Sequence, residues 1–186
     1  MNSFEIKQGW VQGVKHAPSP HFDTRPEQQA ISLLVIHNIS LPPGEFGGPY
    51  IEDLFLGRLD CTAHPFFEQL DGLRVSAHCL IRRDGSLVQF VDFNHRAWHA
   101  GVSCFDGIER CNDFSIGIEL EGTDTQDYSE AQYTCLHALT TSILKAYPEI
   151  NPERITGHEH IAPGRKTDPG PAFDWEKYKA RLEADL

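Results

Sequence analysis

The chain has 186 residues, 40% of them apolar, which predicts one globular domain covering residues 1–186 and argues against disorder. Its formal net charge of −11 disfavours nonspecific binding of nucleic acid, which needs a basic surface. No apolar run approaches the roughly 20 residues of a membrane helix, and residues 1–10 lack the apolar stretch of a secretory signal.

The cysteines indicate the compartment. They are odd in number and none forms a C-x-x-C pair; they are Cys61, Cys79, Cys104, Cys111 and Cys135. Together with the absence of a recognisable signal sequence, this pattern favours reduced thiols over disulfides. We therefore expect a cytoplasmic protein that has neither a membrane nor a nucleic acid as its partner.

The first predicted elements are a strand, a loop and a helix. Residues 30–36 are a continuous apolar run rich in β-branched side chains, which predicts a buried central strand. His37 and Asn38 follow at its end, where sites on α/β sheets tend to lie. Residues 40–50 contain two clusters of glycine and proline and predict a loop that could act as a lid, and residues 51–55 predict a short helix.

The middle of the chain predicts three more strands. Residues 75–81 and 86–91 are joined by Asp84-Gly85, the turn chemistry of a hairpin. Residues 115–121 alternate, with isoleucine and leucine on one face and Gly117, Glu119 and Glu121 on the other.

The last third predicts two helices around a short strand. Ser129 and Gln132 fit a capping box, and the helix they open has a buried stripe of Leu136, Leu139, Ile143 and Leu144. Pro148 ends that helix, residues 154–156 predict a strand, and Asp174 could cap a C-terminal helix with Trp175, Tyr178 and Leu182 on its apolar face. These elements predict a mixed α/β fold, a single mixed sheet flanked by helices.

Residues 157–170 form a loop crowded with reactive groups. A catalytic zinc site needs about three protein donors and an open position. His37, one histidine of the pair His158/His160, and Asp168 could supply them. The choice within the pair stays open on chemistry alone; we favour His158 because it directly follows a predicted strand end.

Two further residues could act on a substrate. Glu119 is either a surface glutamate or a buried general base with a raised pKa, and Glu121 on the same face is its competitor. We modestly favour Glu119 because it lies deeper in the strand. Lys166, two residues before Asp168, could stabilise an oxyanion, although most lysines are surface charges. Cys79 or Cys104 as a nucleophile lacks an identifiable base.

Five segments together resemble the zinc-dependent N-acetylmuramoyl-L-alanine amidases, in particular the AmpD-type 1,6-anhydro-N-acetylmuramyl-L-alanine amidases. The segments are residues 34–48, 74–85, 96–101, 111–122 and 157–170. The resemblance implies the amidase and peptidoglycan-recognition fold, in one zinc amidase domain. The implied activity is hydrolysis of the amide bond between (1,6-anhydro-)N-acetylmuramic acid and L-alanine, in cytosolic peptidoglycan recycling that influences β-lactamase induction.

The resemblance also assigns roles to residues. It implies Zn²⁺ held by His37, His158 and Asp168, with Glu119 as proton acceptor and Lys166 as transition-state stabiliser. It suggests that the muropeptide, a small-molecule partner, is bound by Asn38, Arg74, Trp98 and Arg110. Ile108 stands where relatives tend to have arginine, a departure that touches no proposed ligand. We expect a monomer.

Two alternatives share this fold. A peptidoglycan-recognition module would bind without catalysis, but such a module should have lost a zinc ligand or the base, and this chain has all of them. A wall-degrading amidase acting on polymer is the other alternative; we expect it to carry a secretory signal.

Overall fold

The computed structural model describes residues 3–183, and its centre is one six-stranded mixed sheet. The strand order is β12-β5-β11-β6-β7-β3, and every neighbouring pair is parallel except the β6–β7 hairpin. The sheet strands are β3 (Lys15–His16), β5 (Leu33–Ile39), β6 (Cys79–Ile81), β7 (Leu87–Gln89), β11 (Ser115–Glu121) and β12 (Ile155–Gly157). The predicted mixed α/β fold is confirmed.

Short pairs and helical turns complete the architecture. The pairs are β1 (Ile6–Lys7) with β2 (Trp10–Val11), β4 (Phe22–Thr24) with β8 (His95–Ala97), and β9 (Cys104–Phe105) with β10 (Ile108–Glu109). The α-helices are α1 (Tyr50–Phe55), α2 (Glu130–Ala146), α3 (His158–Ile161) and α4 (Trp175–Glu183). The 3₁₀ turns are η1 (Pro65–Leu70), η2 (Cys111–Asp113) and η3 (Pro152–Arg154).

The central strand differs from its prediction. It begins at Leu33 and runs through His37 and Asn38 to Ile39, so both polar residues lie inside the strand and not after it. The reason is pairing: β5 matches β11 in parallel register along its whole length and β12 along its first half. Tertiary pairing therefore extends the strand past the point where the apolar pattern stops.

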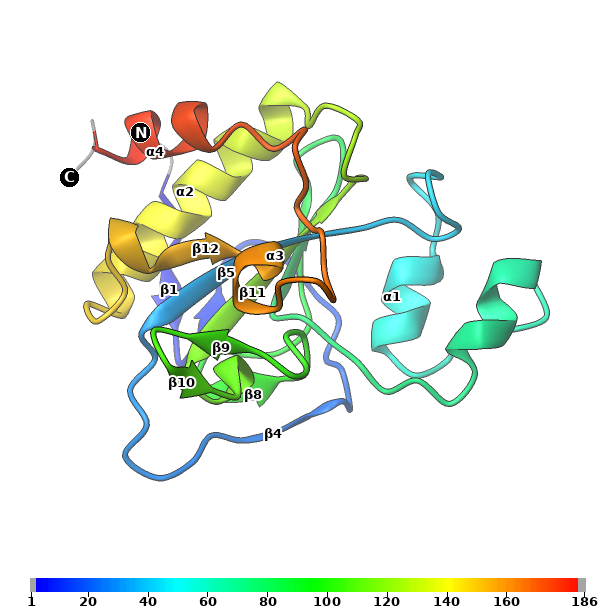
Figure 1. Ribbon diagram of the computed structural model, residues 1–186, viewed down its shortest axis with the longest axis horizontal. Coiled ribbons are helices and arrows are strands. Elements are labelled where there is room, and N and C mark those ends of the chain that lie inside the picture. Colours follow the sequence, from blue (N-terminus) through cyan, green and yellow to red (C-terminus); the bar gives the residue numbers. More distant parts are fainter. Residues whose placement is uncertain (1–2, 184–186) are drawn as a thin grey trace.

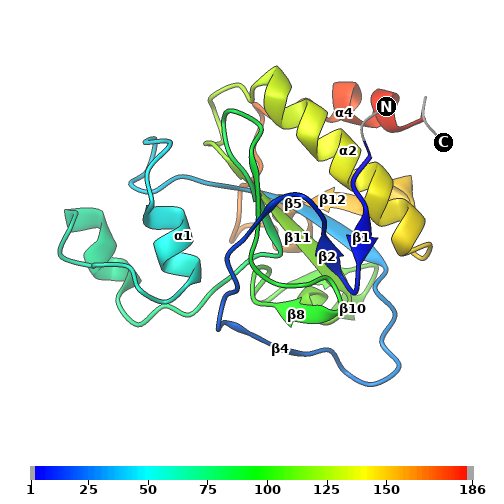
Figure 2. The same cartoon turned by 180° about the vertical axis from the view of Figure 1, so that it is seen from behind.

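Helices α2 and α4 cover one face of the sheet (Figures 1 and 2). Their apolar side chains pack on Ile116, Ile118 and Leu120 of β11, as the alternation in this strand predicts. The capping box is present, because Ser129 Oγ accepts from the Gln132 amide and Gln132 Oε1 accepts from the Ser129 amide. Asp174 caps α4 by accepting from the Lys177 amide at 2.9 Å. This part of the fold follows local signals closely.

The opposite face of the sheet is covered unevenly. Loops around β8 and η2, together with α3, pack on one part, while α1 and η1 stand apart from α2 at the other end of the molecule (Figure 1). Between them, polar side chains of β5 and β11 reach a cavity. None of the five cysteines is in a disulfide, and within residues 3–183 we find no helix that has both the length and the apolar character to cross a membrane.

Candidate active site

Three ligand-type side chains converge at the edge of this cavity. His37 comes from β5, His158 is the first residue of α3, and Asp168 lies in the loop after α3. His37 Nδ1 is 3.0 Å from His158 Nδ1, and Asp168 Oδ2 is 3.0 Å from the former and 3.1 Å from the latter. Within residues 3–183, these three side chains form a group that could hold one metal ion, because their donor atoms all lie within 4.8 Å of one another.

The chemistry of these donors fits a cation. His158 Nε2 faces the carbonyl oxygen of Ala100 at 3.0 Å, and because that oxygen only accepts, Nε2 carries the proton. In the neutral ring of His158, Nδ1 then carries a lone pair. This lone pair points at Nδ1 of His37 and at the carboxylate of Asp168. Acceptors facing acceptors repel one another unless a cation or a proton lies between them. Two imidazoles and one carboxylate are a donor set typical of catalytic zinc.

Burial and hydrogen bonding set the charge of these groups. Burial lowers the pKa of His37 to about 4, so its ring is neutral at pH 7. Burial opposes the ionisation of Asp168, but hydrogen bonds with His158 and His37 outweigh it and lower its pKa well below the ordinary value. Both residues therefore have the deprotonated form that metal binding requires.

The cavity beside this cluster has a volume of about 360 Å³ and contains the other predicted catalytic residues. Glu119 and Lys166 line it together with the three ligand-type residues. One wall is apolar and consists of Leu54, Phe55, Phe66, Leu70, Leu73 and Val75. The cavity can therefore hold a small molecule with an apolar side opposite a polar reactive edge.

Glu119 is buried without a partner for one of its oxygens. It lies opposite His37 in the β11–β5 register and is 8% exposed. Its Oε2 has no hydrogen-bond partner among residues 3–183. Burial, and then the nearby charge of Asp168, raises the pKa of Glu119 well above its ordinary value. A carboxyl in this state is suited to proton transfer near neutral pH.

Lys166 and His160 are both exposed, but only Lys166 lines the cavity. Lys166 lies in the loop after α3 and lines the cavity. His160 lies in α3 with its ring centroid 6.1 Å from that of Trp175, outside the cavity lining. The geometry thus brings His158, not His160, to His37 and Asp168.

Two of the four predicted substrate residues line the cavity. Asn38 lines it while its Nδ2 donates to Asp124 Oδ1 at 2.8 Å and to the Pro169 carbonyl at 3.1 Å. Asn38 therefore also ties the segment after Asp168 to the sheet. Trp98 stacks on His21 with a centroid distance of 6.0 Å, and its buried Nε1 has no partner in the described chain.

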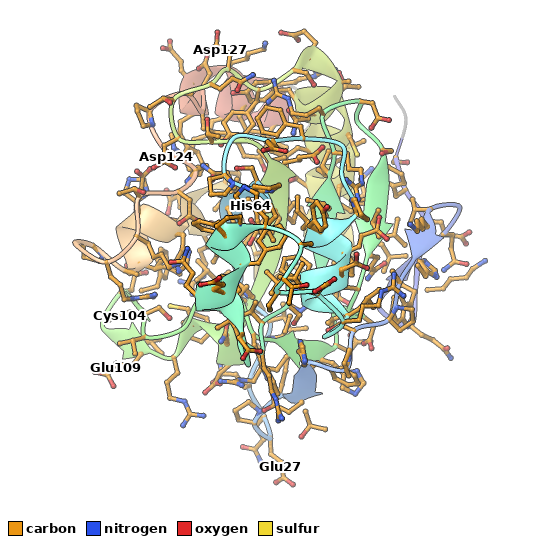
Figure 3. The ribbon with its side chains drawn as sticks, turned by 90° about the vertical axis from the view of Figure 1, so that its right-hand side faces the viewer. Glu27, His64, Cys104, Glu109, Asp124 and Asp127 are labelled. Atoms are coloured by element: carbon orange, nitrogen blue, oxygen red, sulfur yellow. The ribbon has the colours of Figure 1, made fainter. Side chains whose placement is uncertain are left out.

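The two arginines lie outside this lining. Arg74 is exposed beside an adjoining hollow of about 170 Å³. Arg110 pairs with Asp113 at 3.2 Å and lines a separate hollow of about 550 Å³. In Figure 3, its neighbour Glu109 lies with Cys104 on the β9–β10 hairpin, well away from His64. Contact of either arginine with substrate stays a prediction, as does the effect of Ile108, which is exposed on β10.

One residue at the site was missed as a functional candidate. The sequence alone assigns His99 no role, yet its Nδ1 is 2.8 Å from His37 Nε2. Its ring lies on Gly117, where a Cβ atom would come within 2.4 Å of it. A glycine at this point of the strand was the available signal, because it marks where another group approaches the sheet closely.

Comparison with known proteins identifies the family of this chain. The family model described as N-acetylmuramoyl-L-alanine amidase matches residues 27–171. The 1,6-anhydro-N-acetylmuramyl-L-alanine amidase AmpD of Escherichia coli K12 is 62% identical over 180 residues, covering 97% of this chain and 98% of its own. This chain belongs to the N-acetylmuramoyl-L-alanine amidase family. The predicted resemblance and the prediction of an amidase are confirmed.

Solved structures show the same fold for this amidase. A crystal structure of a selenomethionine derivative of AmpD superposes with a TM-score of 0.93 at 59% identity, covering 96% of this chain and 99% of that one. The Escherichia coli amidase AmiD, solved with anhydro-N-acetylmuramic acid-L-Ala-D-γ-Glu-L-Lys, gives a TM-score of 0.61 at 28% identity. That match covers 97% of this chain and 66% of AmiD.

Proposed function

We propose that this amidase, acting as one zinc-dependent domain, hydrolyses the amide bond between 1,6-anhydro-N-acetylmuramic acid and L-alanine in free muropeptides. The observation that supports a zinc site is the convergence of two imidazole nitrogens and a carboxylate oxygen. They lie beside Glu119, a buried carboxyl with one unpartnered oxygen. The choice of an anhydro substrate is supported by the near-full-length similarity to AmpD.

The proposed ligands are His37, His158 and Asp168. Zinc, when bound, supplies Lewis acidity that polarises an amide carbonyl and makes a water molecule more acidic. The remaining steps belong to the protein. Because its pKa is raised, Glu119 can take the proton of the attacking water and pass it to the leaving amine of L-alanine.

Lys166 is proposed to meet the charge that develops on the carbonyl oxygen. Its ammonium group lies on the loop that borders the cavity and can donate a hydrogen bond to the oxyanion of the tetrahedral intermediate. Asn38 and Trp98 are proposed to hold the muropeptide in the cavity, and Arg74 and Arg110 are proposed to contact the parts of it that extend beyond the cavity lining.

The cellular role is part of the same proposal. Five cysteines without a disulfide are compatible with a reducing cytoplasm. There the enzyme would act as a monomer on muropeptides released during peptidoglycan recycling, and removal of these compounds would influence β-lactamase induction. The net charge of −11 supports the absence of a nucleic-acid partner.

One experiment tests activity and substrate together. Metal-free protein is reconstituted with zinc and incubated with an anhydromuropeptide and, separately, with intact peptidoglycan, and the released stem peptide is quantified. We expect release from the anhydromuropeptide, little release from polymer, and none after zinc is removed with a chelator. Glu119→Gln provides a control that keeps the three proposed ligands.

Three other outcomes would contradict the proposed function. Release from polymer alone would replace recycling with wall degradation. No release from either substrate by protein that has bound zinc would favour a peptidoglycan-recognition module, and full activity of the chelated protein would remove zinc from the mechanism.

A further inference from the structure

The two proposed imidazole ligands are supported by adjacent residues of one loop. His99 Nδ1 is 2.8 Å from His37 Nε2, and the Ala100 carbonyl is 3.0 Å from His158 Nε2. His37 and His158 are 121 positions apart in the sequence, yet the dipeptide His99-Ala100 contacts the far side of both rings. Its placement therefore affects the orientation of two ligands at once.

Each contact selects one tautomer. The Ala100 carbonyl only accepts, so it holds the proton of His158 on Nε2. His99 Nε2 is 3.1 Å from Ser115 Oγ, and if it donates there, His99 Nδ1 is free to accept the Nε2 proton of His37. In that arrangement both ligand rings present an Nδ1 lone pair to the proposed metal position, which is the form that zinc binds.

One side-chain oxygen accepts from both amides of this dipeptide, while the Arg165 guanidinium donates to the Ala100 carbonyl at 2.6 Å. Asn112 Oδ1 accepts from the His99 amide at 3.1 Å and from the Ala100 amide at 2.8 Å. Asn112 is 6% exposed, and its backbone carbonyl accepts from the Arg25 guanidinium at 3.0 Å. The asparagine is thus fixed in place, and two consecutive backbone amides are fixed to it.

The sheet leaves space for this arrangement. The ring of His99 occupies the position above Gly117 that a side chain on β11 would fill, since a Cβ atom there would lie 2.4–2.7 Å from three ring atoms. The absence of a side chain at this one point of β11 lets the ring reach His37 on the neighbouring strand. The glycine and the asparagine therefore serve the same placement.

We propose that Asn112 and His99 are positioning residues for the metal centre, with Asn112 setting the orientation of both imidazole ligands through the His99-Ala100 dipeptide. This inference rests on the proposed zinc site. Loss of such outer partners typically lowers metal affinity about 10- to 100-fold. We expect about 10-fold for His99→Phe, which frees His37 alone, and up to about 100-fold for Asn112→Leu, which also loosens Ala100.

The test measures zinc affinity and not turnover. Metal-free wild-type protein and variants compete for Zn²⁺ with a chromophoric chelator, and the unfolding midpoint of each metal-free protein is recorded alongside. His99→Asn and Asn112→Asp are the rescue variants: the asparagine Oδ1 can replace the acceptor nitrogen Nδ1 of His99, and the aspartate keeps an acceptor oxygen in place of Asn112 Oδ1. Ser103→Ala is the matched control: Ser103 Oγ bonds Gly101 and Cys111 in the same loop and does not contact the dipeptide.

The expected result is weaker zinc binding by His99→Phe and Asn112→Leu, and near-normal binding by both rescue variants and Ser103→Ala. The absorption spectrum of the cobalt(II) protein should change in the two weakened variants, since it reports ligand geometry. Affinity within about twofold of wild type in both would overturn the inference while leaving the zinc site intact.

If Asn112→Leu does not fold, the comparison of His99→Phe with His99→Asn tests the positioning role. Equal affinities for His99→Phe and His99→Asn would then refute the positioning role. Wild-type protein that fails to bind zinc contradicts the proposed function itself, so the two failures are distinguishable.

Discussion

Glu119 and Glu121 occupy the same face of the same strand, two residues apart, and both are buried. Glu121 is fully engaged: Oε1 accepts from the Gly47 amide at 2.7 Å and from Arg82 Nη1 at 3.3 Å, and Oε2 accepts from the Arg83 amide at 3.1 Å. Glu119 has an oxygen with no partner in residues 3–183 and faces a cavity.

The difference shows that burial of a carboxyl does not by itself mark a catalytic residue. Glu121 joins the predicted loop at residues 40–50 to the β6–β7 turn, and Arg82 extends that link to Glu52 of α1. An unsatisfied buried carboxyl is destabilising, so its presence beside a cavity indicates a functional role.

The largest effect is expected for Glu119→Gln. Glutamine keeps the shape of the side chain but cannot take a proton from water, so kcat should fall by about 10² to 10⁴. Released stem peptide is the readout, and zinc content, measured by elemental analysis, should equal that of the wild type. Activity within tenfold of the wild type would remove Glu119 from proton transfer.

Lys166→Ala should lower kcat by about 10² to 10³ with a smaller change in KM, because the lost contact forms chiefly in the transition state. An aspartate ligand tempers the Lewis acidity of zinc, so the lysine should matter more here than beside a site with three neutral ligands. Lys145→Ala, an exposed position at the end of α2, is the control. A near-normal rate for Lys166→Ala would contradict this role.

Glu121→Gln should lower stability and leave the chemistry intact. Loss of the charged hydrogen bonds with Arg82 and two backbone amides should reduce the free energy of unfolding by about 1–3 kcal/mol. Urea unfolding of the metal-free protein measures this, with the exposed Glu149→Gln expected to change by less than about 0.5 kcal/mol. If Glu121→Gln were as inactive as Glu119→Gln when folded, the contrast between the two residues would not hold.

The smallest effect is a pH dependence of stability. The pKa of Glu119 lies well above 4.5 in the folded protein, so above pH 4.5 the native state keeps a proton that the unfolded state has lost. Stability of the metal-free wild type should therefore fall as pH rises through this window, by at most about 1.4 kcal/mol per pH unit.

Glu119→Gln removes that contribution. It should be more stable than the wild type above this window when both are metal-free, whereas Glu121→Gln should be less stable. Parallel stability–pH curves for wild type and Glu119→Gln would show that burial does not hold the proton on Glu119.

Much of the fold could be predicted because its signals are local. The capping box at Ser129, the Asp84-Gly85 turn and the alternation of β11 each depend on residues a few positions apart. The end of β5 could not be predicted in this way, because the strand continues through His37 and Asn38 only where β11 pairs with it.

By itself, the sequence determined the fold class, the family and the set of candidate donors, since these depend on residue type and short-range pattern. Only the tertiary structure decided how the candidates are arranged: His158 beside His37, Glu121 tied to Arg82 and Glu119 left without a partner for one oxygen. It also placed His99 against Ser115 and Gly117 of β11, which lie 16 and 18 residues further along the chain. The physical reason is that hydrogen-bond satisfaction depends on groups distant in sequence, which become neighbours only when the sheet and its loops are assembled.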